Sequence, residues 1–175
     1  DKGDRENIEL VNHKAKAGYA LGYADPEYIS VLPTFQMPFL SRARKSRTFQ
    51  ISGDSMPPVG EGSWVTGEYV QNWKTLRDGQ TYIIITKEDV IVFKVVYNQL
   101  KTTGNLLLCS TNPVYQPYEV PISEVLEIWK FVHFISHELP EPNLSRDELS
   151  RSVLDLRKEV GQLRMAMEKQ GRLAL

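Results

Sequence analysis

The feature that most constrains the fold is a series of short apolar segments between residues 48 and 136. The segments read RTFQIS, SWVTGEYV, TYIIIT, VIVFKVVY, NLLLCS and EVLEIWKFVHFI. Each is rich in β-branched or aromatic residues, and turn-forming residues separate them, which is typical of strands. KED after the third segment predicts a short hairpin connection, whereas the Pro-rich NPVYQPY cannot be a central strand. The sequence therefore predicts a mainly β domain.

The region before these segments has a different character. Residues 1–47 contain short apolar pieces interrupted by Gly and Pro, which predict extended segments and turns without a good helix. A basic cluster, SRARKSR, ends the region. It predicts a solvated loop, with a contact surface for an acidic partner as the alternative.

The region after HELPEPN has a helical pattern. SRDE, at Ser145 to Glu148, is a capping-box sequence that opens a helix. Apolar residues then follow at spacings of 4, 3, 4, 3 and 4: Leu149, Val153, Leu156, Val160, Leu163 and Met167. This heptad seam predicts a short coiled coil between chains, although Gly161 and Gln170 weaken the pattern. Docking of one amphipathic helix on the β domain is the alternative.

Lys94 lies in the middle of the strand segment VIVFKVVY. Side chains alternate along a strand, so Lys94 shares a face with Val92 and Val96, and both faces look buried. Burial lowers the pKa of a lysine, and a neutral amine is a general base that commonly partners a serine. The alternative is a lysine near a strand end whose amine reaches solvent.

Ser55 is the best serine candidate. In FQISGDSMPP, a strand enters a Gly-Asp-Ser turn and two prolines stop it. This turn would expose Ser55 and let the backbone N–H groups of Ser55 and Met56 converge on an oxyanion. SGDS is also ordinary turn chemistry. Together, however, Ser55 and Lys94 are a stronger indication of a Ser–Lys dyad than either residue is alone.

These residues together resemble the LexA-like self-cleaving repressors, a family that includes lambda repressor and UmuD. GDSM resembles the family's Gly-x-Ser-Met segment, and VFKVV, with Lys94 39 residues after Ser55, resembles its lysine strand. NPVYQPYEV resembles an Asn-x-x-Tyr-x-Pro segment of the family. Ser63 in GEGSW and Val95 depart from the family pattern. The resemblance covers residues 10–136.

The resemblance implies a β-clip-like peptidase domain of twisted antiparallel strands, followed here by a helix with coiled-coil heptads. It also implies a substrate within the same chain, an Ala-Gly bond upstream of the serine. Ala17–Gly18 in KAKAGYALGY lies 38 residues before Ser55. Small residues let an extended segment lie flat across a serine; the alternative is a flexible, turn-rich link.

We therefore predict three regions. Residues 1–47 form an N-terminal linker with the cleavage site, residues 48–137 the peptidase and dimerisation core, and residues 138–175 a linker and the C-terminal helix. The predicted protein is a LexA-like or phage-repressor-like transcriptional regulator of the SOS response, a serine endopeptidase that cuts its own Ala17–Gly18 bond. The alternative is a non-cleaving dimerisation and sensing domain of a repressor.

The expected partners are a second copy of the chain and a RecA filament. The resemblance implies that DNA would be bound through an N-terminal helix-turn-helix domain, which we expect to be missing from this sequence. A net charge of −1 agrees with this, because it argues against a chain that itself grips nucleic acid. No apolar run reaches the roughly 18–20 residues of a membrane span, so we expect a cytoplasmic protein. Cys109 is the only cysteine, and no metal or cofactor is expected.

Two other enzyme classes fit poorly. A GDSL-type hydrolase needs an aspartate three residues before its histidine, and neither His133 nor His137 has one. A membrane signal peptidase shares the Ser–Lys dyad but needs a transmembrane segment.

Overall fold

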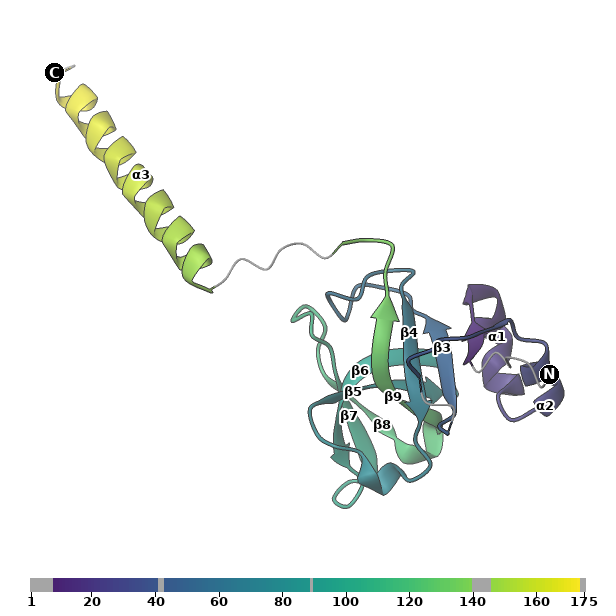
Figure 1. Ribbon diagram of the computed structural model, residues 1–175. Helices are drawn as coiled ribbons and strands as arrows, with labels where there is room; N and C mark the ends of the chain where they lie inside the picture. The colour runs from purple at the N-terminus through teal and green to yellow at the C-terminus, as the bar shows by residue number, and fades with distance from the viewer. Residues whose placement is uncertain (1–7, 41–42, 89, 140–145, 174–175) are drawn as a thin grey trace. The chain divides into compact units, whose positions relative to one another are not determined.

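The computed structural model describes residues 8–40, 43–88, 90–139 and 146–173. The chain divides into two units, Asp1–Leu139 and Pro140–Leu175. Within the described part of the first unit, the strands form one nine-stranded sheet in the order β2-β1-β3-β4-β9-β5-β6-β7-β8 (Figure 1). They are β1 (Ile8–Val11), β2 (Thr34–Phe35), β3 (Ser46–Gln50), β4 (Trp64–Tyr69), β5 (Gln80–Thr86), β6 (Val90–Gln99), β7 (Asn105–Cys109), β8 (Tyr118–Pro121) and β9 (Val125–Ile135).

The mainly β prediction is confirmed. Each apolar segment predicted between residues 48 and 136 forms a strand, and the short strands β1, β2 and β8 were not predicted. Pairing is antiparallel except between β1 and β3, so the sheet is mixed, where antiparallel strands alone were expected. Two 3-10 turns, η1 (Trp73–Thr75) and η2 (Ile122–Glu124), lie between strands.

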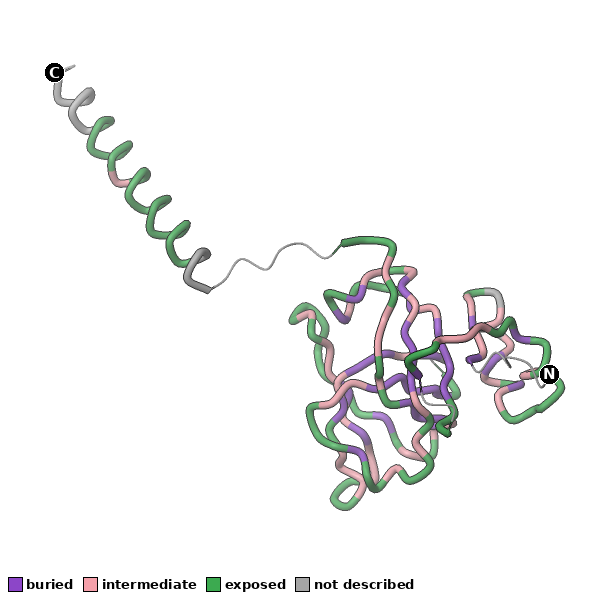
Figure 2. Tube along the Cα trace, viewed as in Figure 1, coloured by how far each residue is buried: buried purple, intermediate pink, exposed green. Residues whose placement is uncertain are grey.

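Strand β5 shows how this sheet is packed on both faces. Ile83 and Ile85 belong to one buried cluster, whereas Tyr82 and Ile84 belong to another, and none of the four is more than 2% exposed. Alternate residues of a strand point to opposite faces, so this continuous apolar run indicates cover on both sides. Figure 2 shows the same concentration of buried residues along the central strands.

The expectation that residues 1–47 contain no good helix is wrong. Helices α1 (His13–Gly22) and α2 (Pro26–Ser30) lie in this region. The side chains of Asn12 and Asp25 cap them by accepting hydrogen bonds from the N–H groups of Ala15 and Glu27, each at 2.9 Å. Tertiary packing then stabilises α1, whose two glycines make it a weak helix former on its own.

The second unit contains the predicted C-terminal helix, α3 (Arg146–Leu173). The proposed cap residue Ser145 lies outside the described residues. Almost every described side chain of α3 is exposed, including the apolar ones (Figure 2). The helix is thus confirmed, while its pairing in a coiled coil stays a prediction. Across the described parts of the chain, no helix is both long and apolar enough to cross a membrane.

Candidate active site

Ser55 lies in a turn that we call the Ser55 corner, residues 51–58, directly after β3. Gly53 has a φ of +86°, a conformation that L side chains rarely adopt, and its N–H donates to a carboxylate oxygen of Glu61. The next residue after Ser55, Met56, is buried and forms an isolated bridge with Val59. The corner is therefore anchored on both sides of Ser55, whose own side chain is half-buried.

The segment that follows β7 holds the other side of the Ser55 corner. The backbone N–H of Asn112 donates to the carbonyl oxygen of Ser55 at 3.1 Å, and its side-chain amide donates to the carbonyl of Asp54 at 3.1 Å. The Thr111 hydroxyl donates to the carbonyl oxygen of Pro57 at 3.0 Å. These bonds fix the backbone around Ser55 from a second element, which a turn alone would not do.

Lys94 contacts Ser55 directly. It lies in the middle of β6 and is 8% exposed. Its Nζ donates hydrogen bonds to Ser55 Oγ at 2.6 Å and to Ser110 Oγ at 2.9 Å. Sheet register explains the second contact, because Val95 pairs with Cys109 across β6 and β7 and Ser110 then follows opposite Lys94. The structure therefore brings the two predicted dyad residues together and adds a second serine.

Tyr115 covers this group. Its ring centroid lies 5.6 Å from Lys94 Nζ, and its hydroxyl donates to Asp54 Oδ1. The hydrogen bond to Asp54 raises the pKa of Tyr115 above its ordinary value. An aromatic face attracts a nearby ammonium group, so Tyr115 contributes to holding the Lys94 side chain in place.

Sequence reasoning missed Ser110, and it quoted Asn112 and Tyr115 only within the family-like segment NPVYQPYEV, without a role at the site. The hairpin register of VIVFKVVY against NLLLCS could have placed Ser110 opposite Lys94, because both segments were predicted as neighbouring strands. Asn112 and Tyr115 come from the Pro-rich link, whose path no local pattern specifies. They are loop residues positioned by the sheet, which is where binding and catalytic groups commonly lie.

The Ala17–Gly18 bond lies inside α1, not in an extended segment. Gly18 and Gly22 form a surface for the ring of Tyr28: a Cβ on Gly22 would lie 2.5 Å from Tyr28 Cγ, and one on Gly18 would lie 3.4 Å from the Tyr28 hydroxyl oxygen. That hydroxyl donates to the carbonyl of Ala15 at 2.8 Å. The two glycines therefore have a packing role between α1 and α2.

Tyr19, the next residue along, anchors α1 in the core. Its side chain is fully buried, and its hydroxyl donates to Glu127 Oε2 at 2.5 Å. Arg47 Nη1 donates to the Tyr19 hydroxyl and lies 3.7 Å from Glu127 Oε2. We call these three side chains the Tyr19 latch. Glu9 extends it by accepting from Arg47 Nε at 3.2 Å, and Trp129 Nε1 donates to Glu127 at 3.0 Å.

Burial sets the electrostatics of the latch. Burial, with a further contribution from Glu127, raises the pKa of Tyr19 well above its ordinary value, so the phenol keeps its proton. Burial alone would lower the pKa of Arg47, but the neighbouring Tyr19, Glu9 and Glu127 raise it overall. The prediction of a solvated basic loop is wrong at Arg47, which lies in β3 and is 0% exposed. A buried arginine is stable only with such partners.

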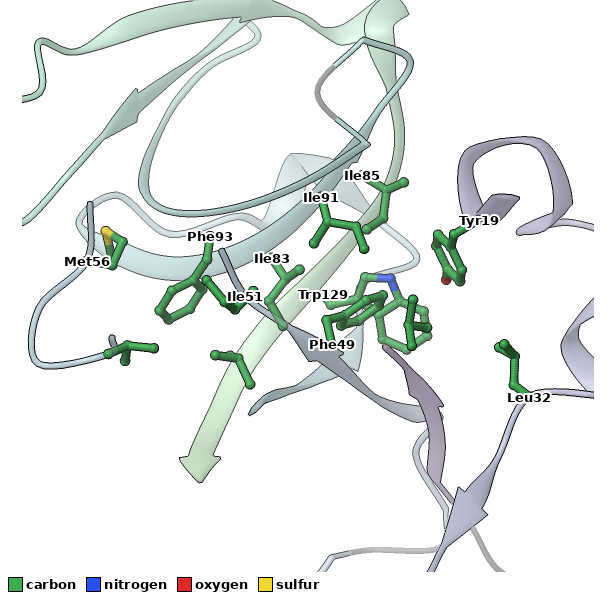
Figure 3. Close-up of a cluster of buried hydrophobic side chains, with 13 residues drawn as sticks. Tyr19, Leu32, Phe49, Ile51, Met56, Ile83, Ile85, Ile91, Phe93 and Trp129 are labelled. Atoms are coloured by element: carbon green, nitrogen blue, oxygen red, sulfur yellow. The ribbon is translucent and has the colours of Figure 1, made fainter. Parts of the chain in front are cut away.

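The latch and the Ser55 corner lie at different ends of one hydrophobic cluster. Tyr19 and Met56 both belong to it, and Figure 3 shows them at its opposite ends, with Phe49, Ile83 and Phe93 between them. The structure thus assembles Ser55 with Lys94 while it holds Ala17–Gly18 in a helix docked elsewhere on the same core.

Comparison with known proteins gives one finding for this chain. A family model described as Peptidase S24-like matches residues 9–132. That range is more than half of the chain, and it includes Ala17–Gly18, Ser55, Lys94 and Ser110. No curated protein matches the chain.

Proposed function

The chain belongs to the Peptidase S24-like family, and on this basis we propose that it is a self-cleaving serine peptidase with a Ser–Lys dyad. The observation that carries the proposal is the 2.6 Å separation of Lys94 Nζ and Ser55 Oγ, in a site where Lys94 is 8% exposed. A general base must lie within hydrogen-bond reach of the proton that it removes. The proposed substrate is the Ala17–Gly18 bond of the same chain.

In the proposed reaction, neutral Lys94 accepts the hydroxyl proton of Ser55, and Oγ bonds to the carbonyl carbon of Ala17. The backbone N–H groups of Ser55 and Met56 stabilise the oxyanion. The bond to the nitrogen of Gly18 then breaks, and Lys94 returns the proton to this leaving amine. Water attacks the resulting ester, with Lys94 as base again, and releases Ser55 and the new carboxylate of Ala17.

Ser110 has a positioning role in this proposal. Its hydroxyl oxygen accepts a hydrogen bond from Lys94 Nζ at 2.9 Å, because the β6–β7 register places Ser110 opposite Lys94. A neutral amine has two N–H donors, one lone pair and a flexible stem, so it needs a second contact to keep its lone pair directed at one hydroxyl. Ser110 would supply that contact without entering the chemistry.

The Ala17–Gly18 bond must leave α1 before it can be attacked, because helical backbone groups bond to each other and are not open to a nucleophile. The pairing of β1 with β3 supports a route. Each β1 residue pairs with the β3 residue 38 positions later, from Ile8 with Ser46 to Val11 with Phe49. Ala17 precedes Ser55 by the same 38 positions.

An extended path from β1 reaches farther than the helix does. Residues 12–17 span about 9 Å as a helix but about 20 Å when extended. Because β1 runs parallel to β3, an unwound segment would continue in the direction that β3 takes toward the Ser55 corner. We infer that cleavage requires α1 to unwind and Tyr19 to leave its latch.

The wider role that we propose follows the family resemblance. The domain would be the C-terminal self-cleavage and dimerisation part of a LexA-like or phage-repressor-like regulator, in the cytoplasm. A RecA filament would act by favouring the released form of the Ala17 segment. Contact with DNA would come from a helix-turn-helix domain outside this sequence.

A second function is favoured by the helical state of the cleavage segment. A non-cleaving dimerisation and sensing domain would also keep Gly18 and Gly22, since both pack against Tyr28. In that case the Ser55–Lys94 contact would be retained for stability only, and α1 would never unwind.

One experiment separates the two functions. The purified chain is incubated at a pH of about 10, near the ordinary pKa of lysine, and at neutral pH with RecA, single-stranded DNA and nucleotide. Intact mass spectrometry should reveal fragments 1–17 and 18–175. Ser55→Ala and Lys94→Ala should abolish them, whereas Ser52→Ala, in the same turn, should not. A chain that stays whole under both conditions would contradict the peptidase proposal and favour the non-cleaving alternative.

A further inference from the structure

One stripe along the exposed surface of α3 is apolar. Val153, Leu156 and Leu163 are 48%, 61% and 64% exposed, and they lie on the same stripe as Val160 and Met167. A helix of this kind is marginal in water without a partner for its apolar face. Leu154 and Met165 are also exposed but lie outside the stripe.

The residue types along the stripe select one kind of partner. The spacing assigns Val153, Val160 and Met167 to heptad position a, and Leu149, Leu156 and Leu163 to position d. Valine at a with leucine at d favours two parallel strands over trimers or tetramers. The residues that make the stripe apolar therefore also favour a two-stranded parallel pair.

A shallow groove on α3 has the composition of a coiled-coil hole. Its lining includes Val153, Leu156, Arg157 and Val160, at positions a, d, e and the next a. In a parallel dimer, these four positions surround a d side chain from the facing helix. Leu156 of a second copy would therefore insert between these residues.

The flanking charges favour the same arrangement. Glu159 is at position g, and Arg164 is at position e of the following heptad. In a parallel, in-register pair these two positions face each other across the interface, so Glu159 of each chain meets Arg164 of the other. An antiparallel pair would instead bring the e-position arginines, Arg157 and Arg164, toward one another.

We propose that α3 binds α3 of a second copy of this chain as a parallel, in-register, two-stranded coiled coil, with reciprocal Glu159–Arg164 ion pairs. The seam runs from Leu149 to Met167. The proposal is independent of self-cleavage, because none of its residues belongs to the Ser55 corner or to α1.

Disulfide trapping in the full chain tests it. In a Cys109→Ser background, Leu156→Cys and Leu163→Cys each place a thiol at a d position, and Lys158→Cys places one on the outer face as a matched control. Under mild oxidation, both d-position variants should form covalent dimers at least tenfold faster than Lys158→Cys. No antiparallel register places residue 156 opposite 156 and residue 163 opposite 163 at once.

Each other outcome overturns the proposal. Trapping at only one d position would mean an antiparallel pair, because a shifted parallel register brings neither residue 156 nor residue 163 opposite its own copy. Equal trapping of all three variants would mean random collision. No trapping above the control would mean that α3 stays single or docks on its own chain.

Charge reversal tests the register. In the Leu156→Cys variant, Glu159→Arg or Arg164→Glu should each lower the yield of covalent dimer by about threefold to tenfold, since each creates two like-charge contacts per dimer. Combining both reversals should restore the yield. Failure of the double variant to recover would rule out the reciprocal pairing of these two residues.

Discussion

The Ser55 corner and helix α1 hold the groups of the proposed reaction in opposite ways. At the corner, Ser55, Lys94 and Ser110 come from different elements and are already in hydrogen-bond contact. In α1, the Ala17–Gly18 bond is held in a helix that Tyr19 latches into the core. The difference indicates that the chemical groups are ready in advance, and that the small fraction of molecules with a released substrate segment lowers the rate of the proposed reaction.

The free energy needed to open the Tyr19 latch determines what fraction of the molecules has a released segment. Withdrawing a fully buried Tyr19 side chain costs about 2–3 kcal/mol, and hydrogen bonds to charged partners add about 1.5–3 kcal/mol. A total of about 4 kcal/mol would leave roughly one molecule in a thousand with the segment released. Slow self-cleavage is therefore expected even from a fully assembled dyad.

The largest expected effect is that of pH on the chemical step. Only neutral Lys94 accepts the proton of Ser55, and the neutral fraction rises tenfold per pH unit below the pKa of the amine. The cleavage rate should therefore rise up to about 100-fold over two pH units and then level off. Mass spectrometry of timed samples measures it, and a rate independent of pH would show that release of α1, not Lys94, controls the reaction throughout.

Removing the second serine should have the next largest effect. Ser110→Ala leaves Lys94 with one hydroxyl contact fewer and should lower the cleavage rate about 30-fold, within the range for a contact that aligns a catalytic group.

Ser110→Thr is the matched variant, since it keeps the hydroxyl and should recover most of the rate. If Ser110→Ala cleaves as fast as the parent protein, Ser110 has no positioning role.

Weakening the latch should act in the opposite direction. Tyr19→Phe keeps the ring that packs against Phe49 but removes the hydroxyl between Arg47 and Glu127. We expect cleavage about tenfold faster, corresponding to a loss of about 1.4 kcal/mol from the docked state. Tyr23→Phe is the control and should change little. A slower reaction would mean that docked α1 is the reactive form.

Substitutions of two glycines should have the smallest effects on the cleavage rate, and they test the difference between the Ser55 corner and α1. Gly53→Ala places a Cβ at a φ of +86° with open space around it, so it strains only the backbone of the corner. Gly22→Ala instead drives a Cβ into the Tyr28 ring and weakens the packing of α1. The same substitution should slow cleavage about fivefold at Gly53 and accelerate it about fivefold at Gly22, at about 1 kcal/mol each. Effects of the same sign would contradict the division between the two regions.

Strand patterns predicted the corner well because they follow local rules. Alternation in VIVFKVVY placed Lys94 inside a covered sheet, and the turn in FQISGDSMPP placed Ser55 at the end of β3. Their contact depends on the order of strands in the sheet, which the sequence alone does not specify. It entered through the family resemblance, and the observed distance now supports it; the catalytic role of the pair stays a prediction.

The α1 region was predicted poorly for a physical reason. KAKAGYALGY contains two glycines and little apolar periodicity, and such a segment is a weak helix by propensity. It is helical because Tyr19 enters the core and Tyr28 packs over the glycines, and both contacts are tertiary. Arg47 was misjudged in the same way: a basic residue is buried only where acidic partners from other strands meet it. The cap Asp25, followed by Pro26, was a local signal that could have revealed α2.

The parallel register of β1 and β3 has a consequence for which parts of the chain can change in length. The two arms that lead from paired Val11 and Phe49 to Ala17 and Ser55 have equal numbers of residues. Deleting one residue from the first arm would shorten its extended path by about 3.3 Å, and deleting one from the second arm would disturb the turn that holds Ser55. Insertions between β2 and β3 would leave both arms intact, so homologous chains should vary in length there and remain constant in the arms.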